Sequence, residues 1–130
     1  MIPADLIGLP YLSKGRTVNG TDCWGLVCMF YAGVFQIELP SYSEQYKSSE
    51  DRATVSQSVI SNLGNWAKVD KPAYGDLLVF NILGLPVHTA VYVGGGDFLH
   101  CFHKTNTCIE RLSSITWNRR LHGIYRWAKT

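Results

Sequence analysis

The apolar residues in the first half of the chain follow a helical spacing. Residues 1–20 are punctuated by Pro and Gly, and we expect a loop that holds one short helical turn. Between residues 23 and 35, apolar positions then recur every three or four residues, at Leu26, Val27, Phe30 and Val34. Thr21 or Asp22 just before them is a good N-cap. The pattern predicts a helix from about residue 23 to about residue 35.

A second helix is predicted from about residue 49 to about residue 63, after a polar loop over residues 36–48. Ser48 or Ser49 can cap it, and acidic residues follow in its first turn. Gly64 can end it. Its apolar face would consist of Val55, Val59, Ile60 and Leu63.

The second half of the chain has the pattern of β-strands. Apolar and β-branched runs alternate with turns, and the glycines at 94–96 form a hairpin turn. The predicted strands cover residues 66–69, 76–80, 87–93, 97–103, 107–112 and 121–127. Helices followed by antiparallel strands predict one α+β domain over residues 1–130, with the N-terminal helices packed on an antiparallel sheet of five or six strands.

Composition narrows the classes of protein that fit. The 130 residues suit one domain, and 46% hydrophobic with 17% charged residues is a globular composition. The net charge is +2 without a basic tract, which argues against a nucleic-acid partner. Since no apolar run approaches the ~20 residues of a membrane helix, we expect no membrane insertion. The first residues lack the basic and apolar regions of a signal peptide, so we expect synthesis without one.

The cysteine count leaves three interpretations open. The four cysteines are Cys23, Cys28, Cys101 and Cys108. An even count allows two disulfides, but the missing signal peptide argues against them, and we expect Cys101 and Cys108 to be reduced. A zinc site made by Cys23, His88 and His100 is an alternative, although no ligands form the close pairs of structural zinc sites. The third interpretation is a nucleophile with a histidine base.

Cys23 is the candidate nucleophile because it falls at the start of the first predicted helix. Free backbone N–H groups and the helix dipole favour a thiolate there and lower the thiol pKa, whereas burial alone would raise it. The same N–H groups can stabilise an oxyanion beside the sulfur. A small apolar residue at a helix start is the alternative interpretation. We expect Cys28, further along this helix, to pack in the core.

Two histidines are candidates for the base. If residues 94–96 form a three-residue loop, His88 lies opposite Phe102, and His100 is its diagonal neighbour on the same face. Diagonal neighbours lie roughly 7–8 Å apart, close enough for two imidazoles to meet. One histidine could then hold the other in the tautomer that accepts a proton from the thiol. A two-residue loop would shift the register. We expect His103, on the opposite face, and His122 to be structural.

Four segments, in order, resemble the NlpC/P60 family of papain-like cysteine peptidases. Residues 8–11 (GLPY) resemble its G-x-P-Y motif, and residues 21–27 (TDCWGLV) its D-C-S-G-L-V nucleophile motif. Residues 72–80 (PAYGDLLVF) resemble its P-x-x-G-D-L-V-F strand. Residues 87–94 (VHTAVYVG), followed by residues 98–100 (FLH), resemble its H-V-G-I-Y-x-G strand and following histidine. The ordered set is far more specific than any one motif.

The resemblance implies the papain-like NlpC/P60 fold and three catalytic residues. Cys23 would be the nucleophile, His88 the general base and His100 the orienting residue. Family members hydrolyse amide bonds of peptidoglycan stem peptides, often between D-glutamate and diaminopimelate. The reaction is acyl transfer through a thioester, and the resemblance implies neither a metal nor a cofactor.

The resemblance also implies supporting roles near the nucleophile. Tyr11 would lie beside it and help to polarise the substrate carbonyl. Asp22 would cap the helix and support the site. Trp24 stands next to the nucleophile where bacterial enzymes usually have Ser, and we include it among the substrate-binding residues. Thr89 departs from the small residues that usually follow the base, which affects the shape of the pocket.

Residues 23–43 look more like the versions found in tail proteins of long-tailed bacteriophages. The resemblance therefore implies a phage-tail peptidoglycan endopeptidase that opens the cell wall locally during infection. Its partners would be stem peptides and other tail-tip proteins. It would be made in the host cytoplasm, carried in the virion tail, and act at the host cell wall or periplasm. The alternative is a weakly active or inactive structural protein of the tail tip or of tail assembly with the same fold.

Overall fold

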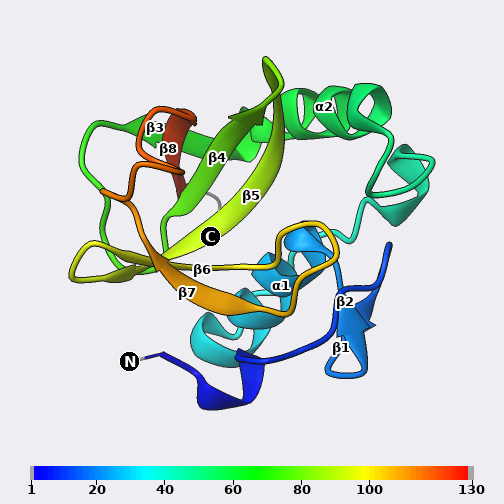
Figure 1. Ribbon diagram of the computed structural model, residues 1–130, viewed down its shortest axis with the longest axis horizontal. Helices are drawn as coiled ribbons and strands as arrows, with labels where there is room; N and C mark the ends of the chain where they lie inside the picture. The colour runs from blue at the N-terminus through cyan, green and yellow to red at the C-terminus, as the bar shows by residue number, and fades with distance from the viewer. Residues whose placement is uncertain (1, 129–130) are drawn as a thin grey trace.

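The computed structural model describes residues 2–128 and consists of helices packed on one antiparallel sheet (Figure 1). The sheet has six strands in the order β3-β8-β4-β5-β6-β7. The strands are β3 (Trp66–Val69), β4 (Leu77–Ile82), β5 (Leu85–Gly94), β6 (Asp97–His100), β7 (Cys108–Arg111) and β8 (Leu121–Trp127). Both main helices, α1 (Cys23–Phe30) and α2 (Arg52–Ser61), contact β5. The predicted α+β architecture is confirmed.

The first helix begins where its cap residue predicts. Asp22 is the N-cap, and its carboxylate accepts a hydrogen bond of 2.9 Å from the Gly25 amide. After α1 the chain continues as a π-helical segment, Tyr31–Phe35, so the predicted span of 23–35 is confirmed. The N-terminal loop contains the predicted helical turn at Ala4–Leu6. It also contains an unpredicted two-stranded sheet, whose strands are β1 (Arg16–Thr17) and β2 (Gly20–Thr21).

The second helix differs from its prediction at the start. It begins at Arg52, and its cap is Asp51, which accepts a hydrogen bond from the Thr54 amide, rather than Ser48 or Ser49. The reason is that residues 48–51 form a turn, closed by the Asp51 amide on the Ser48 carbonyl. The prediction of the apolar face is wrong for Ile60, which is 49% exposed. Short 3-10 turns at Ser43–Gln45 and Leu63–Asn65 flank the helix.

The hairpin between β5 and β6 has the predicted register, but its turn differs from the predicted one. Gly94 pairs with Asp97, so the turn contains two residues and not three. A β-bulge between Tyr92 and Gly94 compensates for the shorter loop, and Tyr92 pairs with Phe98. Strand β6 ends at His100, before the predicted end at residue 103. The side chains of β5 and β6 therefore face as the three-residue loop would have placed them.

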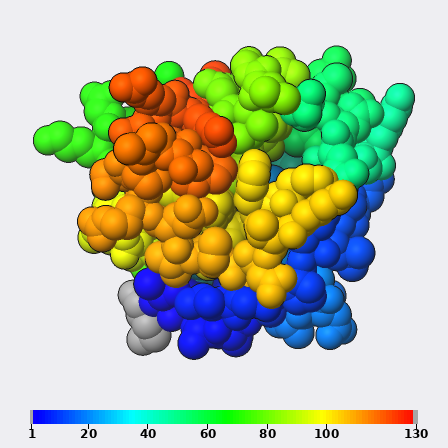
Figure 2. Space-filling model, viewed as in Figure 1, coloured from blue at the N-terminus to red at the C-terminus, as the bar shows by residue number. Residues whose placement is uncertain are grey.

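The sheet buries side chains on both faces. One cluster joins α1 to the sheet and includes Leu26, Phe30, Val79 and Val91. The other includes Phe80, Phe98 and Trp117. Trp117 belongs to the segment between β7 and β8, which lies over the sheet in the face seen in Figure 2 (orange). Among the described residues, no helix combines the length and the apolar character needed to span a membrane.

Candidate active site

Cys23 is the first residue of α1, where the backbone amides have no partner in a preceding helical turn. Two of the first four amides are occupied: the Gly25 amide donates to the Asp22 carboxylate, and the Leu26 amide donates to the Asp22 carbonyl. Within the described part of the chain, the amides of Cys23 and Trp24 have no hydrogen-bond partner. These two amides are available to bind a negatively charged oxygen beside the sulfur.

The Cys23 thiol is held in its neutral form. Burial raises the pKa of this thiol, and the Asp22 carboxylate raises it further, whereas the neighbouring Thr89 and Arg16 act in the opposite direction. The expectation of a lowered thiol pKa is therefore wrong, because burial and the adjacent Asp22 carboxylate both raise it. The sulfur lies 4.0 Å from the carbonyl oxygen of Val87, the residue before His88. Among the described contacts this is its hydrogen-bond acceptor, so the thiol must rotate to meet an imidazole.

His88 on β5 and His100 on β6 are in direct contact. The Nε2 atom of His88 lies 2.8 Å from the Nδ1 atom of His100, as the strand register predicted. Burial lowers the pKa of His88 well below its usual value, and His100 and Arg120 lower it further. Burial also lowers the pKa of His100, although Glu110 acts in the opposite direction. Both imidazoles are therefore neutral near pH 7.

Glu110 on β7 extends the histidine pair to a third side chain, which the sequence did not indicate. Its Oε2 atom lies 2.6 Å from the Nε2 atom of His100. An ionised carboxylate can only accept a hydrogen bond, so Nε2 of His100 carries the proton and Nδ1 is the acceptor. Nε2 of His88 must then donate to that Nδ1. The remaining nitrogen of His88, Nδ1, is left with a free electron pair and can act as a base.

Aromatic rings enclose the two histidines. Trp117 stacks on His88 with ring centroids 5.2 Å apart, and it meets His100 edge-on at 5.1 Å. Phe80 and Phe102 lie beside His88 at 5.9 and 5.2 Å. These rings hold the imidazoles in fixed orientations and remove them from water, which explains the lowered pKa values. The contribution of Trp117 was also missed, because it comes from an irregular segment without a periodic pattern.

A pocket of about 260 Å³ connects Cys23 with His88. Tyr11 also lines it, as predicted, and the Tyr11 hydroxyl is buried without a well-formed hydrogen bond to the described residues. Glu50 and His103 line it as well: the His103 Nδ1 atom lies 3.5 Å from the Glu50 Oε2 atom, and the His103 ring meets the Tyr11 ring edge-on at 5.4 Å. His103 was expected to be structural, but the chain turns after His100 and brings it to the pocket.

Asp22, the residue before Cys23, connects the start of α1 to the neighbouring segments of the chain. It is buried, and besides capping α1 it forms an ion pair of 2.8 Å with Arg16. The hydroxyls of Tyr46 and Ser49 donate to the same carboxylate at 2.5 and 3.1 Å. Asp22 therefore lies where the sequence predicted it, at the N-cap of the helix that carries Cys23. Ser49, which we expected as a helix cap, serves this network instead.

Trp24 points to the other side of Cys23, into a smaller apolar pocket of about 50 Å³. Its indole N–H donates to the Pro40 carbonyl at 2.9 Å, and its ring meets Trp66 edge-on. Thr89 lines the same pocket. Both residues that depart from the family pattern thus shape one apolar cavity beside the sulfur.

The four cysteines are free thiols in the structure. Cys28 is partly buried against the core cluster under α1, and Cys101 is fully buried in it. Among the described residues, the group of possible metal ligands that comes together is His100, Cys108 and Glu110, not the expected set with Cys23. The zinc interpretation based on Cys23 therefore has no support from the geometry.

Comparisons with known proteins show which proteins this chain is similar to. The family model described as NlpC/P60 family matches residues 8–126. The chain is 27% identical over 123 residues to the murein DD-endopeptidase MepS/murein LD-carboxypeptidase of Escherichia coli, covering 95% of this chain and 58% of that protein. It is 30% identical over 124 residues to the murein DD-endopeptidase MepH of the same species, covering 92% of this chain and 41% of that protein. The chain thus spans about half the length of these relatives.

A solved structure of an NlpC/P60 family protein from Bacillus cereus is similar, with a TM-score of 0.69 and 25% identity. The match covers 95% of this chain and 37% of that one. A lipoprotein-like NLP/P60 family structure from Staphylococcus aureus has a TM-score of 0.67, also at 25% identity, and covers 96% of this chain and 38% of that one. The match of the family model over nearly the whole chain, together with these relatives, shows that the chain belongs to the NlpC/P60 family.

Proposed function

We propose that the chain is a cysteine peptidase that cleaves amide bonds in peptidoglycan stem peptides. The observation that carries this proposal is the ordered series of contacts from Glu110 through His100 to His88, which ends at the pocket shared with Cys23. The series leaves the free electron pair of His88 on Nδ1, and the sequence places the nucleophile of the family motif at Cys23. Peptidoglycan as substrate is supported by the activities named for the two Escherichia coli relatives.

The reaction begins with two neutral groups. The Cys23 thiol rotates from the Val87 carbonyl toward His88 and transfers its proton to Nδ1 as the sulfur attacks the substrate carbonyl. The positive charge that develops on His88 is shared with His100 and balanced by the Glu110 carboxylate. The imidazolium then protonates the leaving amine, and the C–N bond breaks. Water, deprotonated by His88, hydrolyses the thioester and restores the thiol.

The carbonyl oxygen of the substrate becomes negatively charged when the sulfur attacks. Hydrogen-bond donors must already be in place to stabilise this charge. The free amides of Cys23 and Trp24 provide them at the start of α1, where the helix dipole adds its partial positive charge. The Tyr11 hydroxyl is a further donor on the wall of the same pocket. Removing one such donor typically costs roughly 100- to 1,000-fold in kcat.

Digestion of purified peptidoglycan, with mass spectrometry of the released muropeptides, tests the proposal. We expect the wild-type chain to release stem-peptide fragments and Cys23→Ala to release none. Cys28→Ala is the matched control, because Cys28 lies on the same helix with its sulfur 3.7 Å from the Pro40 carbonyl. The proposal is rejected if the wild type cleaves nothing, or if Cys23→Ala cleaves as well as the wild type.

We further propose that this peptidase works in a bacteriophage tail, where it reaches the host cell wall with other tail-tip proteins. The support is the likeness of residues 23–43 to phage tail proteins. A phage that carries Cys23→Ala distinguishes this role from a structural one. Normal tails with lost infectivity are expected for the enzyme. Failed tail assembly would instead indicate a structural tail protein, and infectious phage would remove the proposed role in infection.

A further inference from the structure

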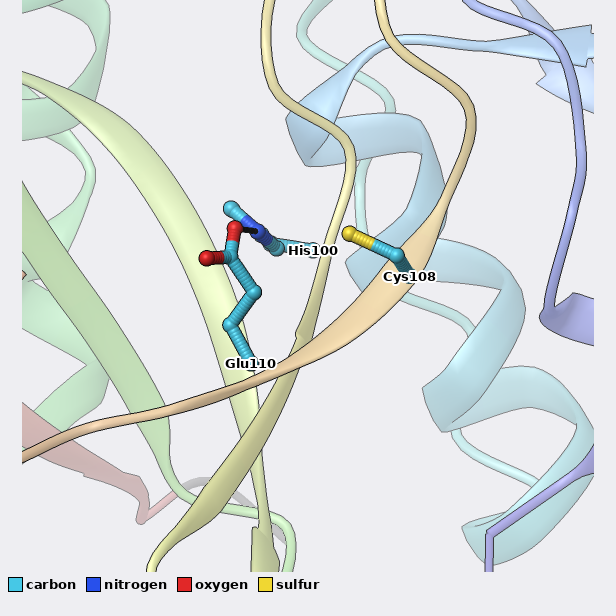
Figure 3. Close-up of side chains that lie close together, drawn as sticks. All are labelled: His100, Cys108 and Glu110. Carbon is cyan, nitrogen blue, oxygen red and sulfur yellow. Dashed lines mark hydrogen bonds and ion pairs between the residues drawn. The ribbon is translucent and has the colours of Figure 1, made fainter. Parts of the chain in front are cut away.

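The contacts from His88 through His100 to Glu110 form a proton relay. A second group of reactive side chains lies at its outer end (Figure 3). His100 on β6 is directly paired with Cys108 on β7, and Glu110 lies two residues further along β7 on the same face. The ligand atoms of these three side chains all lie within 4.8 Å of one another. In Figure 3 the Glu110 carboxylate lies against the imidazole, and the Cys108 sulfur points toward His100.

The three ligand atoms are those that zinc prefers. An imidazole nitrogen, a thiolate sulfur and a carboxylate oxygen bind Zn²⁺ at about 2.0–2.3 Å in a tetrahedral arrangement. Ligands of one such ion therefore lie roughly 3–4 Å apart, so small side-chain rotations suffice to bring this group together. A sulfur ligand disfavours magnesium and calcium, which prefer oxygen.

The surroundings of these three side chains also suit a metal site. Adjacent strands carry all three side chains, and the contacts of His100 with His88, Phe98 and Trp117 fix the ring. The side chain of Glu110 is 39% exposed, which gives an ion access from the solvent. Three protein ligands would leave the fourth position to water.

We propose that His100, Cys108 and Glu110 form a zinc-binding site that switches the proton relay off. Zinc on Nε2 of His100 takes the place of the proton that Glu110 holds there. A neutral imidazole bound through Nε2 must carry its proton on Nδ1, so His100 becomes the donor to Nε2 of His88. His88 then carries its own proton on Nδ1 and can no longer accept one from Cys23. This inhibition rests on the proposed function, whereas the binding of zinc does not.

The protons balance in this exchange. The Nε2 proton of His88 moves to Nδ1 of His100, and Nδ1 of His88 takes a proton from solvent. The Nε2 proton of His100 leaves to solvent, so both imidazoles stay neutral. The Cys108 thiol loses its proton when the sulfur binds the metal, so one proton is released for each zinc bound.

Cobalt titration of the chelator-treated protein tests the binding without any substrate. Co²⁺ occupies zinc sites and reports a bound thiolate by a sulfur-to-cobalt absorption band in the near ultraviolet. We expect one equivalent of Co²⁺ to produce this band in the wild type. Cys108→Ser should lose the band and bind at least roughly 100-fold more weakly, because outer-shell partners alone are worth 10- to 100-fold.

Two further cysteine variants are the matched controls. Cys28→Ser should keep the band, since this thiol lies on α1 and contacts the Pro40 carbonyl. Cys23→Ser should keep it as well. The proposal is overturned if the wild type shows no band, if Cys108→Ser retains it, or if Cys23→Ser loses it. Circular dichroism of Cys108→Ser checks that this near-isosteric variant folds.

The effect on the relay is measured separately. Zinc should slow the alkylation of Cys23 by iodoacetamide and the release of muropeptides in the wild type, and neither in Cys108→Ser. Cobalt binding without any peptidase activity would keep the metal site and reject the proposed function. Cobalt binding with activity that zinc leaves unchanged would reject the switch.

Discussion

The Glu110 carboxylate determines which nitrogen of each buried histidine carries a proton. Its contact with Nε2 of His100 sets the tautomer of His100, and the contact between the imidazoles sets the tautomer of His88. Strand alternation predicted the meeting of the two histidines. It could not predict Glu110, because the register of β7 depends on the irregular loop over residues 101–107, which has no repeating pattern to read.

Glu110→Gln should lower kcat for muropeptide cleavage by roughly 10- to 100-fold, by analogy with the loss of the carboxylate partner of a metal-bound histidine. A neutral amide can donate as well as accept, so it no longer enforces one tautomer. KM should change little, because Glu110 does not line the pocket of Cys23. The assay is run with a chelator present. Asp97→Asn is the control, since its exposed ion pair with Arg111 joins the same two strands. An equal loss of kcat in both variants would show that Glu110 does not act by setting the histidine tautomers.

The alkylation of Cys23 should follow a raised thiol pKa. Because the thiolate is the reactive form, the rate should rise about tenfold per pH unit and continue rising above the free-thiol value of about 8.5. Cys28, whose pKa burial raises to about 12, should behave in the same way. Mass spectrometry after iodoacetamide treatment resolves the two sites. A midpoint for Cys23 well below pH 8.5 would show a thiolate–imidazolium pair and contradict the neutral starting state.

Asp22→Ala should be far more costly than the loss of an ordinary helix cap. The buried carboxylate pairs with Arg16 and accepts from Gly25 and Tyr46, and breaking a buried pair costs about 3–5 kcal/mol. Asp51→Ala, at the cap of α2, should cost about 0.5–2 kcal/mol. Urea unfolding measures both variants. Similar costs would mean that the Asp22 network adds nothing beyond capping.

Among the elements, the start of α1 does most to position the sulfur, and its close packing explains why. A Cβ atom on Gly25 would lie 2.2 Å from the Gly15 carbonyl oxygen and 2.4 Å from the Thr21 hydroxyl oxygen. The helix therefore approaches the N-terminal loop more closely than any side chain permits. The D-C-x-G motif identified this helix start, but the neighbouring β1–β2 sheet was not predicted, since strands of two residues carry no periodicity.

Gly25→Ala should displace the start of α1, with a cost of roughly 1–3 kcal/mol for overpacking and a lower kcat. Gly33→Ala is the matched control on the continuation of the helix, because a Cβ there meets no atom within 4 Å. It should leave kcat unchanged and stability equal or slightly higher. Thermal unfolding and muropeptide release are measured for both. If Gly25→Ala is as stable and active as the control, the close packing of Gly25 does not position the start of α1.

The β5–β6 hairpin shows how an element can be predicted correctly for an incomplete reason. The sequence placed the turn at the three glycines, and the pairing of Tyr92 with Phe98 is the predicted one. The structure reaches it with a two-residue turn and a bulge, which no alternation pattern reveals. By contrast, the start of α2 was misplaced, because several polar residues in a row offer equivalent caps and only the folded turn selects Asp51.

For the whole molecule, the order of helices and strands was sufficient to predict an α+β fold with its sheet. The six-stranded order β3-β8-β4-β5-β6-β7 brings β5 to the centre of the site, where helix α1, β6 and the pocket meet. The wall formed by Glu50 and His103 could not be foreseen, because two loops distant in sequence meet there. The chain thus combines the proposed nucleophile, Cys23, from its first half with the contacts of His88, His100 and Glu110 in its second half.

The most direct test of this arrangement is the ¹⁵N NMR spectrum of the imidazoles in chelator-treated protein near pH 7, with His103→Gln and His122→Gln used for assignment. We expect His88 and His100 to be neutral, each with the proton on Nε2 and an unprotonated Nδ1. A proton on Nδ1 of His88, or a charged imidazolium at either residue, would contradict the relay that prepares His88 to accept the proton of Cys23.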